Sequence, residues 1–365
     1  MPNELKKILI LTASFGEGHN AAARGVRDGL DQVAQHEAEV ELHDLFAETY
    51  GVVNDWARKS YLGLINRAPR AWSVFYRWLD RKKDFDGDFR LLFALKNQLA
   101  QVLARFRPDV IVSAYPAYAH LLDEILGSGG SGTCKRVVIV TDSITVNAIW
   151  YRCSADYFLV PNEPTAAVLC NAGVAAEKIQ TFGFPVNPKF ASLGDVRQPG
   201  RRILYMINAG KATAPELTRR LAQLPQIQLT VTVGRDETLQ RVIENVRSTV
   251  NRDFEIVGWS EDVPRLLAAS HLLVSKAGGA TVQETIAAGC PMIINQIVPG
   301  QEEGNARLIV ETGSGVVALS PQSVVAEVER AFANDAELWR KWSRNIRQLS
   351  RPTASLDVAR FLLAL

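Results

Sequence analysis

The chain has 365 residues, of which 47% are hydrophobic, and it carries 41 basic and 39 acidic side chains. A chain of this length and composition can bury more than one hydrophobic core, so we expect two domains. The net charge of only +2 at neutral pH argues against a nucleic-acid partner. The four cysteines lack the close spacing of a zinc site or a redox dithiol, and no metal site is expected.

Short runs rich in isoleucine and valine alternate with longer amphipathic segments in the first half of the chain. This alternation is typical of βα units around a parallel sheet that is buried on both faces. The strands that we expect are Lys7–Thr12, Val40–Asp44, Val110–Ala114, Arg136–Thr141 and Tyr157–Pro161. They predict an α/β domain over residues 1–195.

A basic and aromatic region, residues 50–95, interrupts this first domain. Residues 51–110 contain twelve basic and six acidic side chains. An aromatic helix face is predicted by the i, i+3, i+4, i+7 spacing of Trp72, Phe75, Tyr76 and Leu79. Together with Arg77, this face is typical of a helix that lies in the interface of an anionic membrane. A helix packed on its own domain would show the same spacing.

A second set of strands follows an interruption at residues 190–200, which we interpret as a hinge. The expected strands are Arg202–Ile207, Gln228–Val233, Phe254–Val257, Leu272–Ser275, Met292–Asn295 and Gly315–Val317. They predict a second α/β domain over residues 196–345. From Pro321 onward the apolar spacing is helical, and a last helix within 346–365 is expected to pack back on the first domain.

The segment TASFGEGHNAAARGV follows the first strand. It predicts a glycine turn through Gly16 and Gly18 and a helix that starts near Asn20. His19 then lies at the carboxyl end of a strand, where ligands of α/β sheets bind. A neutral imidazole there can take a proton from an acceptor hydroxyl. A histidine that merely caps the helix or packs at its start fits the same spacing.

A second motif is SKAGGATVQETIAAGCPMIINQIVPGQEEGNA, from Ser275 to Ala306. Gly278 and Gly279 open a helix whose first-turn N–H groups can bind a diphosphate. Glu284, further along this helix, can accept hydrogen bonds from a ribose diol. The polar side chains that suit the hydroxyls of a hexose are Gln301, Glu302 and Asn305. An ordinary βαβ unit with a polar helix start is the simpler interpretation of any one of these residues.

These segments, with VTDSITVNAIWYRCSADYFLVPNE and FGFPVNPKF, resemble glycosyltransferase family 28, which contains monogalactosyldiacylglycerol synthases and processive diacylglycerol glucosyltransferases. The likeness extends from about residue 7 to residue 330. It implies a GT-B fold, in which two Rossmann-like parallel-sheet domains face each other across a cleft. It also implies an inverting, metal-independent transfer with no cofactor, from a UDP-sugar to a lipid acceptor.

Site residues carried over from the resemblance fall into three groups. His19 is the candidate general base, with Gly16 and Gly18 shaping its turn on the acceptor side. Asp142 either orients the base or acceptor or caps a helix. The donor-binding residues are Gly210, Val257, Gly258, Gly278, Gly279, Thr281, Glu284, Gln301, Glu302 and Asn305, with Val257 and Gly258 offering backbone groups to uracil.

Two departures from the family pattern are visible. The turn after the first strand of the second domain reads MINAGKATAPEL, with only Gly210 where the family is glycine-rich, and less space is left near the donor. Lys211 in this turn can bring positive charge to the leaving diphosphate or simply be solvated. Asn147 occupies the neighbourhood in which the family often has a histidine.

The sequence therefore predicts a glycosyltransferase that moves a hexose from a UDP-sugar to diacylglycerol or a related glycolipid. We expect a cytoplasmic protein held peripherally at the inner face of the cell membrane. Two alternatives stay open: a non-hydrolysing UDP-sugar epimerase, and a catalytically inactive UDP-sugar-binding membrane sensor. The pattern does not choose the sugar, the lipid or the oligomeric state.

Overall fold

The structure is a computed structural model that describes residues 5–51, 92–127, 134–194, 196–198, 200–250, 252–298 and 302–365. Its internal contacts divide the chain into two compact units. The first unit contains Met1–Pro188, Val298–Gly304 and Thr353–Leu365, and the second contains Lys189–Ile297 and Asn305–Pro352. The predicted membrane-contacting residues Trp72, Phe75, Tyr76 and Arg77 lie outside the described residues.

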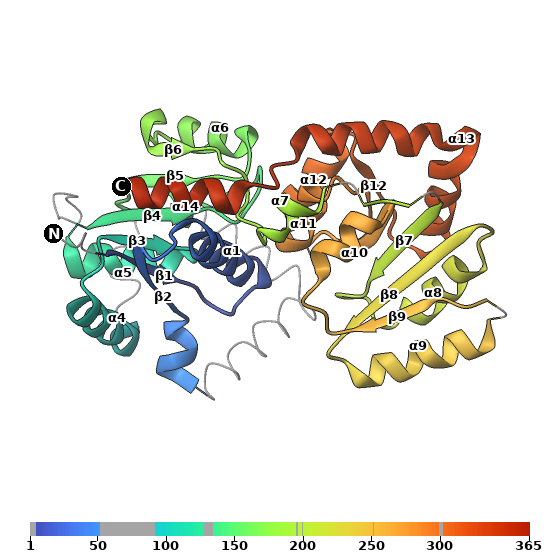
Figure 1. Cartoon of the computed structure of the whole chain (residues 1–365), viewed down its shortest axis with the longest axis horizontal. Helices are drawn as coiled ribbons and strands as arrows, with labels where there is room; N and C mark the ends of the chain where they lie inside the picture. The colour runs from blue at the N-terminus through green and yellow to red at the C-terminus, as the bar shows by residue number, and fades with distance from the viewer. Residues whose placement is uncertain are drawn as a thin grey trace. The chain divides into compact units, whose positions relative to one another are not determined.

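The first unit is built on a six-stranded parallel sheet with the order β2-β1-β3-β4-β5-β6 (Figure 1). Its strands are β1 (Lys6–Leu11), β2 (Ala38–His43), β3 (Val110–Ser113), β4 (Lys135–Ile139), β5 (Tyr157–Leu159) and β6 (Ile179–Gln180). All five strands predicted for this half of the chain are present. The two-residue β6 was not predicted, because two residues are too few to show a period.

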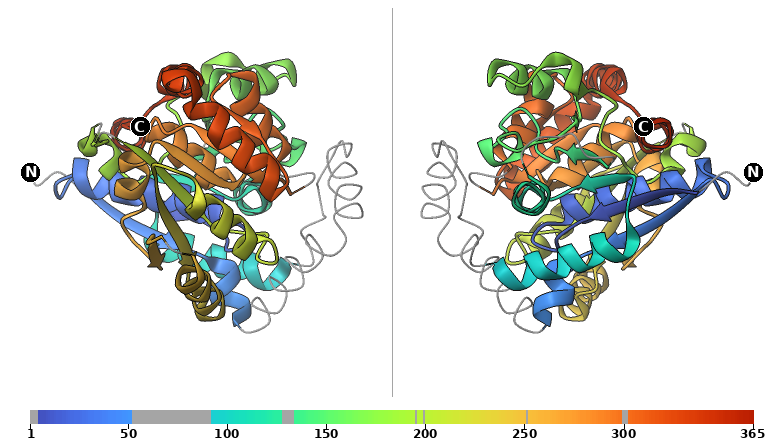
Figure 2. Two further views of the ribbon diagram at one scale, coloured as in Figure 1. Left: turned by 90° about the vertical axis from the view of Figure 1, so that its right-hand side faces the viewer. Right: turned by 90° about the vertical axis from the view of Figure 1, so that its left-hand side faces the viewer.

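Helices cover both faces of this sheet, as Figures 1 and 2 show. The helices are α1 (Glu17–Val33), α4 (Phe93–Phe106), α5 (Pro116–Leu126), α6 (Glu163–Asn171) and α14 (Ala354–Ala364), with 3₁₀ turns η2 (Ala148–Trp150) and η3 (Ala176–Lys178). Leu9 and Leu11 of β1 pack in one cluster with residues of α4 and α5. Ile8 and Ile10 point to the opposite face and are equally buried. The alternation explains why the strand is apolar throughout.

The last helix, α14, belongs to the first unit and packs against α1. Gly29 of α1 makes this close approach possible, because a Cβ there would lie 2.4 Å from the Ser355 carbonyl oxygen. The helix predicted within 346–365 begins only at Ala354, since the residues up to Leu349 continue α13 of the second unit.

The second unit contains another six-stranded parallel sheet, with the order β12-β11-β10-β7-β8-β9. The strands are β7 (Arg201–Met206), β8 (Ile227–Gly234), β9 (Glu255–Gly258), β10 (Leu272–Lys276), β11 (Met292–Gln296) and β12 (Gly315–Val317). The helices are α7 (Lys189–Leu193), α8 (Ala214–Gln223), α9 (Glu237–Thr249), α10 (Val263–Ala269), α11 (Gly279–Ala287), α12 (Glu303–Glu311) and α13 (Pro321–Leu349). All six predicted strands are present, so the α/β prediction of two Rossmann-like parallel sheets is confirmed.

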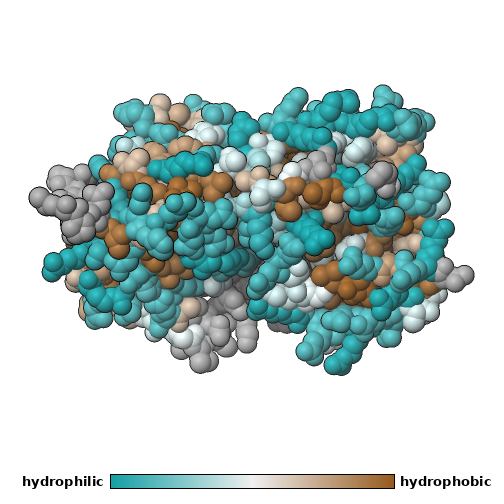
Figure 3. Space-filling view, viewed as in Figure 1, coloured by the Kyte–Doolittle hydropathy of each residue, from teal (hydrophilic) through white to brown (hydrophobic). Residues whose placement is uncertain are grey.

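Surface and core are separated as expected for two α/β units. The face drawn in Figure 3 is mainly hydrophilic, with hydrophobic residues gathered in patches between the polar ones. One apolar cluster of the second unit joins its central strands to α8, α9 and α13. Among the described helices, none combines the length and the apolar character that a membrane span requires.

Candidate functional site

His19 lies in the first turn of α1, directly after the loop that leaves β1. The loop is fixed by polar contacts: Asp44 accepts hydrogen bonds from the backbone and hydroxyl of Ser14 at 2.9 and 2.6 Å. Asn20 accepts a bond from the Thr12 hydroxyl at 2.9 Å and donates to Ser14 at 3.1 Å. These bonds hold the start of α1 against the carboxyl end of the sheet. Asp44 was not predicted to do this, because it lies in a different part of the sequence.

The His19 ring is held by contacts of its Nδ1 atom with described residues. Its Nδ1 lies 3.0 Å from the Ala114 carbonyl oxygen and 3.1 Å from the Thr141 hydroxyl. Because a carbonyl oxygen only accepts, the neutral ring carries its hydrogen on Nδ1 and keeps a lone pair on Nε2. Within the described part of the chain, Nε2 has no hydrogen-bond partner.

Aromatic side chains surround this imidazole. Tyr115 packs edge-on at a centroid distance of 5.0 Å, and Trp150 is tilted at 5.8 Å. Burial lowers the pKa of His19 to about 4, while the hydrogen bond from Nδ1 to Ala114 acts in the opposite direction. The ring is therefore neutral at pH 7, although the residue keeps part of its surface exposed.

Asp142 acts on a neighbour of His19. Its Oδ2 accepts a 2.9 Å hydrogen bond from the indole N–H of Trp150, and this bond sets the position of the ring that packs on His19. Asn147 caps the turn that carries Trp150, since its side chain accepts a bond from the Ile149 backbone N–H at 3.1 Å. Neither aromatic neighbour of His19 was singled out from the sequence.

The predicted turn glycines have different surroundings. Gly16 is the N-cap of α1 in an extended conformation with φ of −162°. Other residues adopt this conformation, and an added Cβ would meet the His19 ring only at ordinary contact distance, 3.5 Å. Gly18 lies inside the first turn of α1.

In the second unit, α11 begins at the carboxyl edge of the sheet. Its N-cap Gly278 makes no side-chain cap bond, so the first-turn N–H groups of the helix stay available. Asn208, after β7, donates to the Ser275 and Thr281 hydroxyls at 3.4 Å each. Thr281 is buried, and Glu284 lies one turn further along, half-buried. The sequence-predicted helix start is thus brought together with the turn after β7.

The other predicted donor residues are placed as follows. Asn305 is 5% exposed and donates to the Ala277 carbonyl oxygen at 3.1 Å, next to the start of α11. Its buried Oδ1 has no hydrogen-bond partner among the residues that the structure describes. Glu302 lies in the segment assigned to the first unit and accepts a 2.9 Å bond from the Val298 N–H. Gln301 lies outside the described residues. Val257 and Gly258 end the edge strand β9 and are followed by the exposed Trp259.

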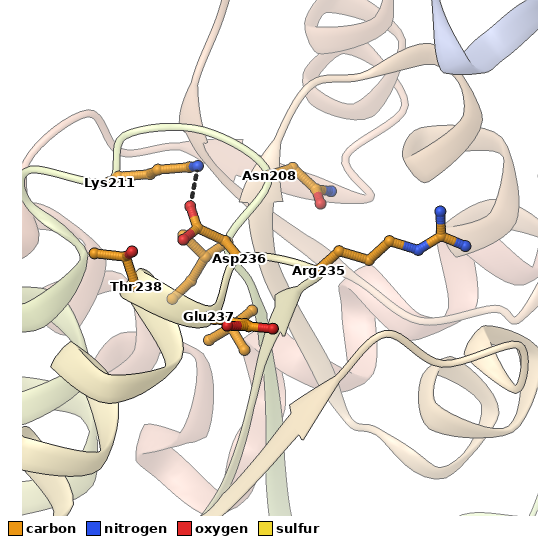
Figure 4. A pocket seen from close by; sticks show the side chains of 8 residues that line it. Asn208, Lys211, Arg235, Asp236, Glu237 and Thr238 are labelled. Carbon is orange, nitrogen blue, oxygen red and sulfur yellow. Dashed lines mark hydrogen bonds and ion pairs between the residues drawn. The ribbon is translucent and has the colours of Figure 1, made fainter.

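A pocket of about 590 Å³ opens at the ends of β7 and β8 (Figure 4). It is lined by Ile207, Asn208, Lys211, Val233, Arg235, Asp236, Glu237 and Thr238. Lys211 forms an ion pair with Asp236. Gly210 turns the chain here with φ of +68°, and a Cβ at this position would lie 2.9 Å from Gln296 Oε1. This left-handed conformation favours glycine in the turn.

Two family models together match most of the chain. The model of monogalactosyldiacylglycerol (MGDG) synthase matches residues 19–186, and the model of the glycosyltransferase family 28 C-terminal domain matches residues 206–350. The chain belongs to glycosyltransferase family 28. It is a UDP-sugar glycosyltransferase, and the resemblance stated from the sequence is confirmed.

Curated relatives extend over nearly the whole chain. A probable monogalactosyldiacylglycerol synthase 2 of Oryza sativa subsp. indica is 26% identical over 97% of this chain and 80% of its own length. Monogalactosyldiacylglycerol synthase 3 of Arabidopsis thaliana is 25% identical over 98% of this chain and 80% of its own length. Both relatives are described as chloroplastic.

Solved structures with the same fold include both transferases and epimerases. MurG of Acinetobacter baumannii superposes with a TM-score of 0.63 at 17% identity, covering 99% of this chain and 100% of the other. The UDP-GlcNAc 2-epimerase of Neisseria meningitidis, bound to UDP-GlcNAc, has a TM-score of 0.61 at 13% identity, covering 98% and 100%. At these identities the likeness shows the GT-B fold of this family member and nothing of its substrates.

Proposed function

We propose that this family 28 enzyme transfers a hexose from a UDP-sugar to a lipid acceptor, diacylglycerol or a related glycolipid, with inversion and without a metal. The names of the curated relatives support the lipid acceptor, because both relatives described above are named as monogalactosyldiacylglycerol synthases. The family 28 C-terminal domain supports the UDP-sugar donor.

The observation that carries the proposal is the neutral imidazole of His19 with its lone pair on Nε2. In the proposed step, Nε2 takes the proton of the acceptor hydroxyl while the hydroxyl oxygen attacks the anomeric carbon. The bond from that carbon to the UDP oxygen breaks, and the electron pair leaves with UDP. One displacement inverts the anomeric configuration.

Charge that develops on the departing diphosphate needs a positive counterpart. The uncapped start of α11 supplies backbone N–H groups and the positive end of the helix dipole for this purpose. Fixed N–H groups of this kind support a mechanism that uses no metal ion. Within the described ranges, no three His, Cys, Asp or Glu side chains gather as a metal site.

We propose that the protein is held peripherally at the cytoplasmic face of the cell membrane. This proposal rests on the basic and aromatic sequence of residues 50–95 and on the need to reach a lipid acceptor in its bilayer.

A donor-by-acceptor panel tests the proposed function. UDP-galactose, UDP-glucose and UDP-N-acetylglucosamine are each incubated with vesicles that contain diacylglycerol or a glycosyl diacylglycerol, and products are identified by mass. We expect one donor to give a glycolipid whose NMR coupling shows the β anomer, with equal rates in the presence and absence of EDTA.

Three results would contradict parts of this proposal. A retained α anomer would exclude inversion, and a rate abolished by EDTA would exclude metal independence. Conversion of UDP-N-acetylglucosamine to an epimer without acceptor, with no lipid product from any donor, would favour an epimerase.

A further inference from the structure

The ion pair between Lys211 and Asp236 occupies the pocket at the ends of two adjacent strands. Lys211 lies in the loop after β7, and Asp236 lies directly after β8 as the N-cap of α9. Figure 4 shows the lysine side chain extended along the pocket so that its Nζ meets the carboxylate. Parallel neighbours end at the same edge of the sheet, so this contact joins two loops on the ligand-binding edge.

The same edge carries the proposed diphosphate site. Asn208, three residues before Lys211 and also in the pocket lining, bonds to Thr281 in the first turn of α11 at 3.4 Å. The loop that carries Lys211 is therefore attached to the helix start whose N–H groups are available for a diphosphate.

Other charges near the pocket are already held elsewhere. The Arg235 guanidinium stacks on Trp259 at 4.0 Å from the ring centroid, and in Figure 4 it points away from Lys211. Glu237 is exposed and pairs with Arg241 on α9 at 3.8 Å. Lys211, in contrast, pairs with a carboxylate that lines the same pocket, that of Asp236.

We propose that Asp236 is an internal counter-ion that holds Lys211 in the ligand-free enzyme, and that the donor diphosphate displaces it and takes over the lysine. This inference rests on the proposed function, because it requires a diphosphate-bearing donor in the second unit. It makes Lys211 a binding residue for the leaving group and Asp236 a residue that weakens donor binding.

The exchange is feasible because the ion pair is weak and each partner is independently supported. The Lys211 side chain is 60% exposed and that of Asp236 28% exposed, and exposed pairs of this kind contribute little stability. The other oxygen of Asp236 accepts a 2.9 Å bond from the Leu239 N–H, so the carboxylate stays in place when the lysine leaves. A diphosphate carries more charge than one carboxylate and also meets the α11 dipole.

The hydrogen bond from Lys211, together with the cap bond to Leu239, lowers the pKa of Asp236. The carboxylate is therefore charged throughout the neutral range, and pH does not release the lysine there. Only a competing anion does so.

The test measures UDP and uridine binding to the full chain by calorimetry at low salt. Asp236→Asn keeps a side chain that caps α9 and removes the charge, and we expect UDP to bind about two- to fivefold more tightly, the range expected for loss of an exposed ion pair. Lys211→Gln is expected to weaken UDP binding about tenfold, as for a lost charge-assisted contact. Uridine, which has no phosphate, should bind all variants equally.

Glu237→Gln is the matched control, because it removes one negative charge from the same helix start without touching Lys211. In the Lys211→Gln background, Asp236→Asn should change UDP affinity no more than Glu237→Gln does. The inference is overturned if Asp236→Asn and Glu237→Gln tighten binding equally, or if Lys211→Gln leaves UDP binding unchanged. Absence of UDP binding by the wild-type chain would instead overturn the proposed function with it.

Discussion

His19 shows how a single residue can be placed by sequence and defined by structure. The local pattern predicts its position after the first strand and at the start of a helix, and the structure places it in the first turn of α1. Its chemistry depends on contacts with Ala114 and Thr141, which are 95 and 122 residues away along the chain. Those contacts fix the tautomer and leave Nε2 as the basic atom.

Replacing His19 with alanine is expected to lower turnover at least about a hundredfold, because a positioned base contributes that much. UDP affinity should stay unchanged, since the ring lies in the first unit and the proposed nucleotide site in the second. Steady-state kinetics and calorimetry on the same preparation check both. His43→Ala is the control, because His43 pairs with Glu41 and Glu48 and takes no part in the proposed step. Near-normal turnover of His19→Ala would remove this residue from the mechanism.

The lowered pKa of His19 has two consequences for pH dependence. First, the imidazole stays unprotonated down to about pH 4, so kcat/KM should stay level from pH 7 to about 5.5 and fall only as pH approaches 4. A pH–rate profile with lipid vesicles measures this. An acid limb centred near 6.5 would show that the ring titrates as an exposed histidine does.

Second, the same shift links stability to pH. The folded pKa of about 4 lies below the unfolded value of 6.5, so the unfolded chain binds more protons between these values. Stability is then complete above about pH 6.5 and decreases as pH falls toward 4, by at most about 3 kcal/mol. Urea unfolding at a series of pH values measures the slope, and His19→Gln should reduce it. An equal slope in the variant would assign the dependence to other groups.

Some residues of the site could be predicted from the local sequence pattern, and others could not. Gly278 was predicted to open a helix and is the N-cap of α11. His19 was predicted just before a helix that starts near Asn20, but it lies inside α1, which begins at Glu17. Tyr115 and Trp150 pack on His19 from other loops, and no spacing in the sequence reports such a contact. The same holds for Asp236, whose partner Lys211 was noticed without it.

Among the secondary-structure elements, the strands were easier to predict than the ends and kinks of the helices. Buried parallel strands are continuous apolar runs, and all eleven predicted strands are present. Helix α13, whose spacing reads as continuous, departs from helical geometry at Ala333–Ala336, where three residues have positive φ. The helical spacing of hydrophobic residues continues on both sides of this kink, so the sequence pattern does not reveal it.

The packing of α14 on α1 can be tested by a small substitution at Gly29. A methyl group at Gly29 would lie 2.4 Å from the Ser355 carbonyl oxygen, so Gly29→Ala must push the helices apart. We expect a loss of about 1–3 kcal/mol of stability, typical of overpacking, measured as a lower urea midpoint. Asp31→Ala, on the exposed side of α1, is the control and should change stability by less than about 0.5 kcal/mol. Equal stability of Gly29→Ala and wild type would mean that this contact is loose.

The molecule as a whole combines two units that are not two continuous segments. Residues 298–304 belong to the first unit although they lie between the two segments of the second, and residues 353–365 belong to it although they follow the second in sequence. Gly304 shows why the first of these segments is held: a Cβ there would lie 2.1 Å from the Ser143 carbonyl oxygen. The sequence predicts two α/β cores and a returning helix, because periodicity identifies elements. Periodicity does not say which sheet a distant segment packs on. The sequence therefore predicted domain boundaries only at 195 and 345.

The proposed membrane association concerns the whole molecule, and the residues that predict it lie outside those that the structure describes. The spacing of Trp72, Phe75 and Tyr76 with Arg77 predicts an aromatic and basic helix face. Replacing Trp72, Phe75 and Arg77 together with alanine should release the protein from liposomes that contain anionic lipid, because both apolar burial and charge attraction are lost. Flotation through a density gradient measures the bound fraction.

The control for flotation is a variant in which two exposed apolar side chains and one basic side chain of the second unit are replaced. Leu319 and Val310 are exposed apolar residues, and Arg330 supplies the matching positive charge. Their triple alanine variant should float as the wild type does. Turnover of a short-chain acceptor dispersed in detergent should be equal in both variants and the wild type, since it needs no bilayer. If the Trp72, Phe75 and Arg77 variant floats normally but unfolds at lower urea, then these side chains pack within the protein, and another surface must bring the enzyme to its lipid.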